Sequence, residues 1–434
     1  MKVAHIGPPL ARRGGPAGYL WQLRAAAEAA SANPRHALTF PPREDPPAPR
    51  RRSILSRARN IAGTVKRTLL GPPTFYRPSA DDCRREGGAI DELLRASAQS
   101  SCTESAVSID ASRNSGADVL FAHDAAVAEQ LLAIRQPGQQ IWLMVHSPIP
   151  TGLYLAWSFA VPEWDWTEIA RLPDVSRWTQ WEVDVCGRVD RLITACPEAV
   201  AELVRADARF AALPSIDYVM TGAAGPPRRF PDESGGTLRR RWRLPEHGPI
   251  GLFLGSAQPY RGLDVLCAAA AALPASVPGT IVVAGPAPAS VPSHARIRAL
   301  GPVPNVSDLL HAVDFVINVN RFNLFDLSTI EAAEASRPML LHATGGNLRF
   351  EQLGLGCRML ADIAPAAIAD GLTDLFTMPE ASRRDLGAAS RRCYERHLTP
   401  AHLWSRHVEL YDRAASARSS ALQAAQLIAP HGRR

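Results

Sequence analysis

Residues 322–347 read FNLFDLSTIEAAEASRPMLLHATGGN, and this stretch alternates between structural types. A polar loop leads to Asp326 and Ser328, which suit a helix N-cap, and residues 331–335 are good helix formers. Ser-Arg-Pro at 336–338 ends the helix, and Met-Leu-Leu at 339–341 predicts a short buried strand before a Gly-Gly turn. A loop, a helix and a strand in this order favour an α/β domain with a parallel sheet.

The start of the predicted helix is suited to bind an anion. Free backbone N–H groups and the positive end of the helix dipole both face the preceding loop. Glu331 follows within the first turns of the helix, and its carboxylate can accept hydrogen bonds from two hydroxyl groups. One element could therefore hold both a diphosphate and a ribose.

This segment resembles the donor-binding signature of retaining glycosyltransferases of the GT-B fold, family 4 (glycosyl transferases group 1). The signature consists of two acids eight positions apart, a small-residue helix, Gly-Pro, a strand and Gly-Gly. The residues that match are Glu331, Ala332, Ala333, Pro338, Gly345 and Gly346. Two positions differ, because Asn323 stands at the first acid and Arg337 at the glycine that ends the helix.

Other segments resemble the same family in the same order along the chain. Residues 250–262, IGLFLGSAQPYRG, are similar to the strand and loop that open the C-terminal half of such enzymes. Ser256 stands near the usual first Arg of that loop, and Arg261 replaces the usual Lys. Residues 300–303, which end in Val303, resemble the turn that borders the nucleobase in that family. In the N-terminal half, residues 3–18, 118–124 and 141–147 are similar to the first strand with its glycine loop and to two inner strands.

The resemblance implies a set of site residues. The donor-binding residues would be Gly15, Ser256, Val303, Asn323, Phe325, Asp326, Leu327, Ser328 and Glu331. The residues that act in catalysis would be His146, Arg261 and Glu331, and the acceptor would meet Gly14 and His123. The resemblance also implies that no metal or other cofactor is required.

The residues themselves leave alternatives open. Arg261 ends a loop after a predicted strand, where open α/β sheets bind ligands, and it can donate two hydrogen bonds to a phosphate; a solvated surface Arg is the alternative. His146 ends the apolar run WLMVH and can polarise a substrate hydroxyl, or it can be a structural histidine. Glu331 can also be an ordinary surface acid near a helix start.

Length and composition limit the protein class. A chain of 434 residues suits two domains. We predict an acceptor-side Rossmann-like domain at 1–225, a linker at 226–241, a nucleotide-sugar-binding Rossmann-like domain at 242–398, and a helix at 399–420 that packs back on the first domain. No run of 18 apolar residues and no signal peptide are seen, and seven scattered cysteines without a CxxC pair are typical of a cytoplasmic protein.

Charge raises the question of partners. The net charge is +6, but no zinc-finger spacing or aromatic–basic RNA motif occurs, so nucleic acid is not expected. Residues 50–71, RRRSILSRARNIAGTVKRTLLG, are basic with apolar residues at helical spacing. Such a helix can lie on the anionic inner face of a membrane, or it can be an ordinary domain helix.

The sequence as a whole predicts a two-domain GT-B glycosyltransferase whose two Rossmann-like domains face a central cleft. It would move a hexosyl-type sugar, with retention of configuration, from a nucleotide sugar to a glycan, lipid-linked or small-molecule acceptor, as in polysaccharide biosynthesis. Alternatives are a GT-B sugar-nucleotide epimerase or hydrolase, and an inactive scaffold that only binds the donor.

Overall fold

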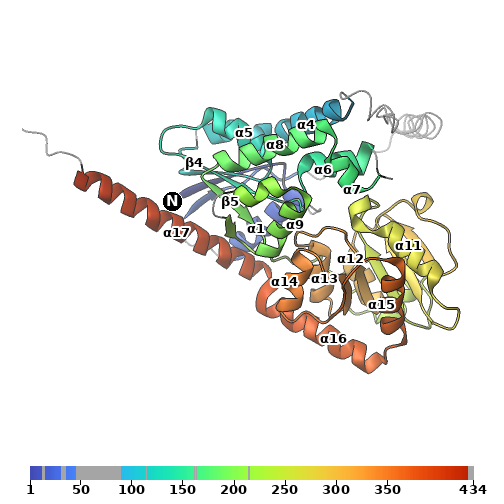
Figure 1. The fold of residues 1–434 in the computed structure, drawn as a ribbon. Coiled ribbons are helices and arrows are strands. Elements are labelled where there is room, and N and C mark those ends of the chain that lie inside the picture. Colours follow the sequence, from blue (N-terminus) through green and yellow to red (C-terminus); the bar gives the residue numbers. More distant parts are fainter. Residues whose placement is uncertain are drawn as a thin grey trace, which may run out of the picture.

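The computed structural model describes residues 1–11, 15–30, 36–44, 89–113, 115–160, 162, 164–213 and 216–428. They form two domains, each built on a six-stranded sheet whose strands are all parallel (Figure 1). This confirms the predicted α/β fold class, with two Rossmann-like domains. The basic segment at 50–71 lies outside the described residues.

The N-terminal sheet has the order β2-β1-β3-β4-β5-β6. Its strands are β1 (Lys2–Ile6), β2 (Ala37–Thr39), β3 (Val119–Ala122), β4 (Gln140–Met144), β5 (Arg191–Thr194) and β6 (Ile216–Tyr218). The inner strands are mostly apolar and buried, and β3 (VLFA) is apolar at every position, because helices cover both faces of a parallel sheet. One face packs on α4 (Ala89–Arg113), α5 (Ala125–Ile134), α8 (Pro173–Arg188) and α9 (Pro197–Ala206), and the other on α1 (Gly15–Ala29) and α17 (Pro400–Ile428).

The C-terminal sheet has the order β12-β11-β10-β7-β8-β9. Its strands are β7 (Ile250–Leu254), β8 (Thr280–Ala284), β9 (Ile297–Gly301), β10 (Phe315–Asn318), β11 (Met339–His342) and β12 (Cys357–Leu360). The strand order reverses between β7 and β10, which are neighbours in the sheet. In open α/β sheets, the crevice at such a reversal point is the usual place for a ligand.

Helices cover both faces of the C-terminal sheet as well. One face packs on α11 (Leu263–Ala272) and α15 (Pro365–Thr377). The other packs on α10 (Gly235–Arg241), α12 (Val306–Ala312), α13 (Leu327–Glu334), α14 (Gly346–Gln352) and α16 (Glu380–Cys393). Residues 235–241, within the segment predicted as linker, thus form a helix that packs on this domain.

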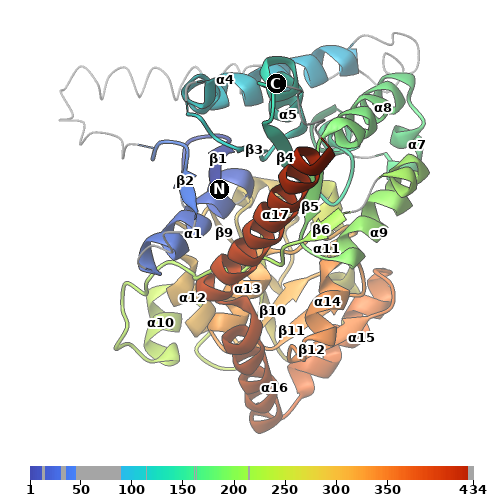
Figure 2. The ribbon, with the colours of Figure 1, turned by 90° about the vertical axis from the view of Figure 1, so that its left-hand side faces the viewer.

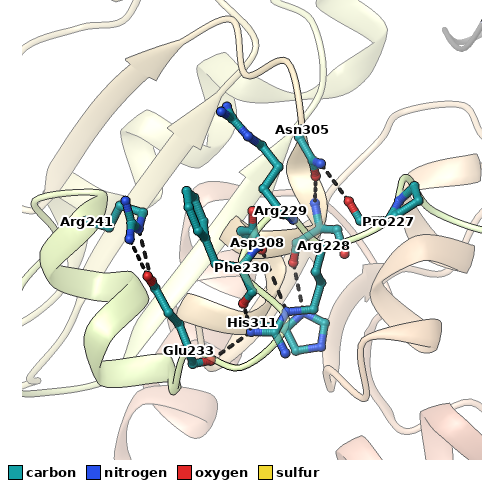
Figure 3. A network of polar contacts seen from close by, with 10 residues as sticks. Pro227, Arg228, Arg229, Phe230, Glu233, Arg241, Asn305, Asp308 and His311 are labelled. Carbon is teal, nitrogen blue, oxygen red and sulfur yellow. Dashed lines mark hydrogen bonds and ion pairs between the residues drawn. The ribbon is translucent and has the colours of Figure 1, made fainter.

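The linker is held to the C-terminal domain by a polar network (Figure 3). The backbone N–H groups of Arg229 and Phe230 donate to the Asp308 carboxylate over 3.1 and 3.3 Å. The Asn305 side-chain amide donates to the Pro227 carbonyl over 2.8 Å. These bonds fix the path of the linker before α10 begins.

The chain crosses between the domains a second time at the start of α17 (Figure 2). The two crossings touch, because the Ala223 N–H donates to the Leu398 carbonyl over 2.9 Å. A Cβ atom at Gly222 would lie 2.2 Å from the Thr399 carbonyl oxygen, so only glycine fits there. Beyond this point α17 runs along the N-terminal domain, where Leu403, Leu410 and Tyr411 are fully buried. Within the described part of the chain, every helix is too short or too polar to cross a membrane.

Candidate functional site

Arg261 lies at the reversal point of the C-terminal sheet. The chain leaves β7, passes Ser256 and forms the short 3-10 helix η3 (Pro259–Arg261). Gly262 then takes a left-handed conformation (φ 73°) that aims the chain into α11. The Arg261 Nη1 donates to Asp326 Oδ2 over 2.5 Å, and its Nε is buried without a hydrogen-bond partner within the described residues. The fold thus joins the loop after β7 to the loop after β10.

Asp326 collects three donors on one carboxylate oxygen. Besides Arg261, the side-chain amides of Asn318 and Asn320 donate to its Oδ2 over 3.0 and 2.7 Å. Asp326 is the N-cap residue of α13 by backbone position, as predicted, but its side chain makes no capping bond. Sequence reasoning missed both asparagines. The run FVIN ends in the polar residue Asn318, which is a signal for a site at this strand end.

The first turn of α13 is open to an anion. The Asp326 carbonyl accepts from the N–H groups of Thr329 and Ile330. The N–H groups of Leu327 and Ser328 have no acceptor within the described residues. Two free N–H groups beside an arginine form a site for a phosphate, but the Asp326 carboxylate already holds that arginine.

Glu331 lies one turn further along α13, next to the linker. Burial, and secondly the charge of Glu334, raise the pKa of Glu331 to about 7. Its carboxylate makes no hydrogen bond within the described residues, whereas Glu334 accepts from the Gly225 N–H over 2.6 Å and from the Tyr394 hydroxyl over 3.2 Å. A Cβ atom at Gly225 would lie 3.7 Å from Glu331 Cγ. Glu331 is therefore a half-buried acceptor without a partner, as a ribose site requires.

The other predicted donor residues take different positions. The Phe325 side chain is buried against Phe350, with ring centroids 4.1 Å apart, so only its backbone can face a ligand. Asn323 is 1% exposed. Its amide donates to Asn347 Oδ1 over 2.8 Å, and its own Oδ1 is buried without a partner among the described residues. Ser256, Val303, Leu327 and Ser328 are half-buried.

The N-terminal domain contributes His146 at the end of β4. His146 is partly exposed, and its Nε2 lies 2.9 Å from His123 Nδ1. His123 is 1% exposed, and its Nε2 lies 3.0 Å from His5 Nδ1. Both ring nitrogens of His123 are thus used inside the domain, and its contact with an acceptor stays a prediction. Gly15 opens α1 with φ 73° and open space on its side-chain face, and Gly14 lies outside the described residues.

The carboxyl ends of the two sheets face each other. Glu202 of α9 accepts from the Gly345 N–H over 3.0 Å, and Glu198 pairs with Arg349 over 3.0 Å. The loops that carry His146 and Arg261 also meet, since the rings of Tyr154 and Tyr260 are 5.7 Å apart. His146 follows the carboxyl end of β4 and Arg261 follows the carboxyl end of β7, so both lie on the sides of the two domains that face each other.

A second hollow lies away from this site. It has a volume of about 750 Å³ and lies between α4, α5 and α8 on the N-terminal domain. Its Trp178 and Trp181 rings pack edge to face, and their N–H groups donate to Asp91 and Glu129. These polar groups satisfy one another, and none belongs to the predicted site.

Comparison with known proteins gives a family-model match within the C-terminal domain and a fold likeness over nearly the whole chain. Residues 248–378, from just before β7 through α15, match the family model described as Glycosyl transferases group 1. The search of curated proteins gives no match.

Solved structures resemble nearly the whole chain at low sequence identity. A sucrose-phosphate synthase from Thermosynechococcus elongatus has a TM-score of 0.62 and 16% identity, over 96% of this chain and 100% of that one. HepE from Anabaena, in complex with UDP-glucose, has a TM-score of 0.56 and 12% identity, over 95% and 100%. A glycosyltransferase from Rickettsia africae has a TM-score of 0.56 and 11% identity, over 95% and 98%. This chain therefore has the GT-B fold, and its C-terminal domain matches the family model of glycosyl transferases group 1 over residues 248–378.

Proposed function

We propose that the protein is a retaining glycosyltransferase that moves a hexosyl-type sugar from a nucleotide sugar to a glycan, lipid-linked or small-molecule acceptor. The observation that carries the proposal is the open first turn of α13 beside Arg261 at the reversal point of the sheet. Free N–H groups and an arginine are the kind of donors that a diphosphate requires. The family match of the same domain supports sugar transfer.

In the proposed complex, the diphosphate lies on the Leu327 and Ser328 N–H groups and the Arg261 guanidinium. Negative charge grows on the leaving phosphate as the glycosidic bond breaks, and fixed donors that strengthen toward this charge lower the barrier. Glu331 accepts from the ribose hydroxyls on the other side of the same helix. His146 approaches the sugar from the N-terminal domain, and closure of the two domains aligns donor and acceptor and excludes water.

A donor-binding scaffold without turnover is the second candidate. Two observations favour it: Asn323 replaces the first acid of the signature, and the Asp326 carboxylate holds Arg261 where a phosphate would. A scaffold would bind nucleotide sugars and leave them unchanged, so turnover separates the two candidates.

The test is a panel of nucleotide sugars. Thermal unfolding identifies the donor that stabilises the protein, and product formation with glycan, lipid-linked and small-molecule acceptors then tests transfer. Stabilisation without transfer to any acceptor would favour the scaffold, and no stabilisation by any donor would refute both candidates.

Arg261→Ala is expected to lower kcat by roughly 10²–10³, the usual effect of removing one group that stabilises developing charge. Arg298→Ala is the matched control, because Arg298 is an exposed arginine on β9 of the same domain. Equal turnover by both variants at saturating donor would remove Arg261 from the site.

A further inference from the structure

Six aromatic polar side chains form one continuous hydrogen-bonded chain inside the N-terminal domain. It runs from the end of β4 through the sheet to the C-terminal helix and back to α1. In order, it contains His146, His123, His5, Tyr411, His407 and Tyr19. The successive N···N, N···O and O···N distances are 2.9, 3.0, 2.9, 3.0 and 2.7 Å.

Five of the six members are buried. His5, His123, His407, Tyr19 and Tyr411 are each at most 3% exposed, and His146 alone is partly open. Burial lowers the pKa of His5 and of His146 to about 3 and that of His123 and His407 well below its usual value. Burial also raises the pKa of both tyrosines. Each imidazole in the chain is therefore neutral, with one N–H donor and one bare nitrogen.

Neutral members restrict the chain to few proton arrangements. Tyr411 has one proton and two imidazole partners, so it donates to one and accepts from the other. If each member donates to the next in the order from His146 to Tyr19, the buried Tyr19 proton has no acceptor among the described residues. If both imidazoles donate to Tyr411, its own buried proton is left over. Either arrangement leaves a buried donor unsatisfied, which is costly.

The opposite direction satisfies every buried proton. Tyr19 donates to His407 Nε2, the His407 Nδ1–H to Tyr411, and the Tyr411 hydroxyl to His5 Nε2. His5 and His123 then each donate through Nδ1–H to the next histidine. His146 accepts on Nε2 and keeps its proton on Nδ1. That nitrogen has no partner in the described structure and is not fully buried, so it is available to a ligand.

We propose that this row of hydrogen bonds locks His146 in the Nδ1–H tautomer, so that His146 donates a hydrogen bond to a substrate oxygen. Tyr411 and His407 of α17 are the positioning residues that set the direction in which the row donates. The part played by this donor in turnover rests on the proposed function. The helix that returns from the C-terminal domain thereby controls a site group of the N-terminal domain.

The test is the protonation state of His146 in the full-length protein labelled with ¹⁵N-histidine. Long-range ¹H–¹⁵N spectra distinguish a protonated from a bare ring nitrogen, and His146→Gln assigns the signals. The wild type is expected to show N–H at Nδ1 only. Tyr411→Phe removes the hydroxyl that links His5 to His407 and so interrupts the row of hydrogen bonds. Either direction of donation then leaves one group unsatisfied, and His146 is expected to become a mixture of tautomers.

Asp412→Asn is the matched control. Asp412 is the next residue of α17 and pairs with His36, whose ring packs on Tyr411. This change perturbs that neighbourhood but removes no hydrogen bond of the His–Tyr chain, so His146 is expected to stay Nδ1–H. If Tyr411→Phe does not fold, Tyr19→Phe cuts the chain at its other end with the same expected result. With an identified donor, Tyr411→Phe is expected to lower kcat roughly twofold to tenfold, the effect of one neutral hydrogen bond, with the donor KM unchanged.

A wild-type His146 protonated on Nε2 would overturn the inference, as would a Tyr411→Phe variant whose His146 stays wholly Nδ1–H. The tautomer is read without substrate. An inactive protein with Nδ1–H at His146 would thus contradict the proposed enzyme and still support the hydrogen-bonded chain.

Discussion

At the scale of one residue, Glu331 predicts that the affinity for the donor depends on pH. Its pKa is about 7, and ribose hydroxyls that donate to the carboxylate favour the ionised form. Binding therefore lowers this pKa and releases a proton. Affinity for the nucleoside part of the donor should rise from about pH 6 to about pH 8, by up to roughly tenfold for each unit by which the pKa falls. Calorimetry in buffers of different ionisation enthalpy measures both effects.

The control is Glu331→Gln, which cannot ionise and should bind the same nucleoside with an affinity independent of pH. A nucleoside without phosphate is used because a terminal phosphate titrates in the same range. A wild type as independent of pH as the glutamine variant would exclude the ribose assignment.

A second prediction concerns Asp326, because its carboxylate faces the place proposed for a diphosphate. Asp326→Asn keeps an oxygen for Arg261 and removes the like charge. A nucleoside diphosphate should bind more tightly by about 1–4 kcal/mol, the repulsion between unit charges about 4 Å apart near a protein surface. Asp264→Asn is the control, since Asp264 pairs with Arg321 in the same domain. Weaker binding to Asp326→Asn would mean that Asp326 orients Arg261 more than it competes with phosphate.

The site residues differ in how far the sequence alone could locate them. Arg261 and Asp326 follow strands that are neighbours across the reversal point, so pattern and spacing suffice to bring them together. The partners of His123 could not be inferred in this way, because His5 lies 118 positions away in the sequence. The next partner, Tyr411, lies 406 positions from His5. Phe325 was assigned to the donor, but a benzyl side chain next to an apolar cluster gains more from burial against Phe350.

At the scale of the element, the turn that carries Arg261 depends on Gly262. A Cβ atom there would lie 2.3 Å from the Val319 carbonyl oxygen, and the backbone has φ 73°. Gly354 has a similar φ of 83° but open space around it. Gly354→Ala should cost only the left-handed strain, about 1–2 kcal/mol. Gly262→Ala should cost clearly more in the free energy of unfolding and should also weaken nucleotide binding. Equal losses in denaturant unfolding would show that the loop relaxes freely.

Strands and helices were predicted most accurately where an apolar run stands between clear breakers. The runs at 250–254, 280–284, 315–318 and 339–342 form β7, β8, β10 and β11. β12, with the mixed sequence CRML, gives no such signal, and it forms because β11 offers a free edge. β6 (Ile216–Tyr218) is short, since residues 219 and 220 already lead toward the crossing between the domains.

At the scale of the whole molecule, α17 holds the two domains in one structure. Leu410 is fully buried against the N-terminal sheet, although it follows the C-terminal domain in the chain. Leu410→Ala should lower the free energy of unfolding by about 2–5 kcal/mol, the usual cost of such a cavity. The exposed neighbour Glu409 provides the control, and Glu409→Ala should change stability by no more than about 0.5 kcal/mol. Similar values in denaturant titrations would mean that α17 is not part of the cooperative unit.

The contact between the two crossings has a topological consequence. Ala223 and Leu398 are joined by a hydrogen bond, so the N-terminal domain is a discontinuous unit into which the C-terminal domain is inserted at a single point. Replacing residues 224–397 with a short glycine turn should therefore give a continuous protein that folds cooperatively. The N-terminal side of the interface that this exposes carries small side chains such as Ala199, and also Trp157 and Trp166, whose rings pack on Phe322 in the intact protein. Retention of the same histidine ¹⁵N signals in the shortened protein would show that this domain is an autonomous host and its partner a removable insert.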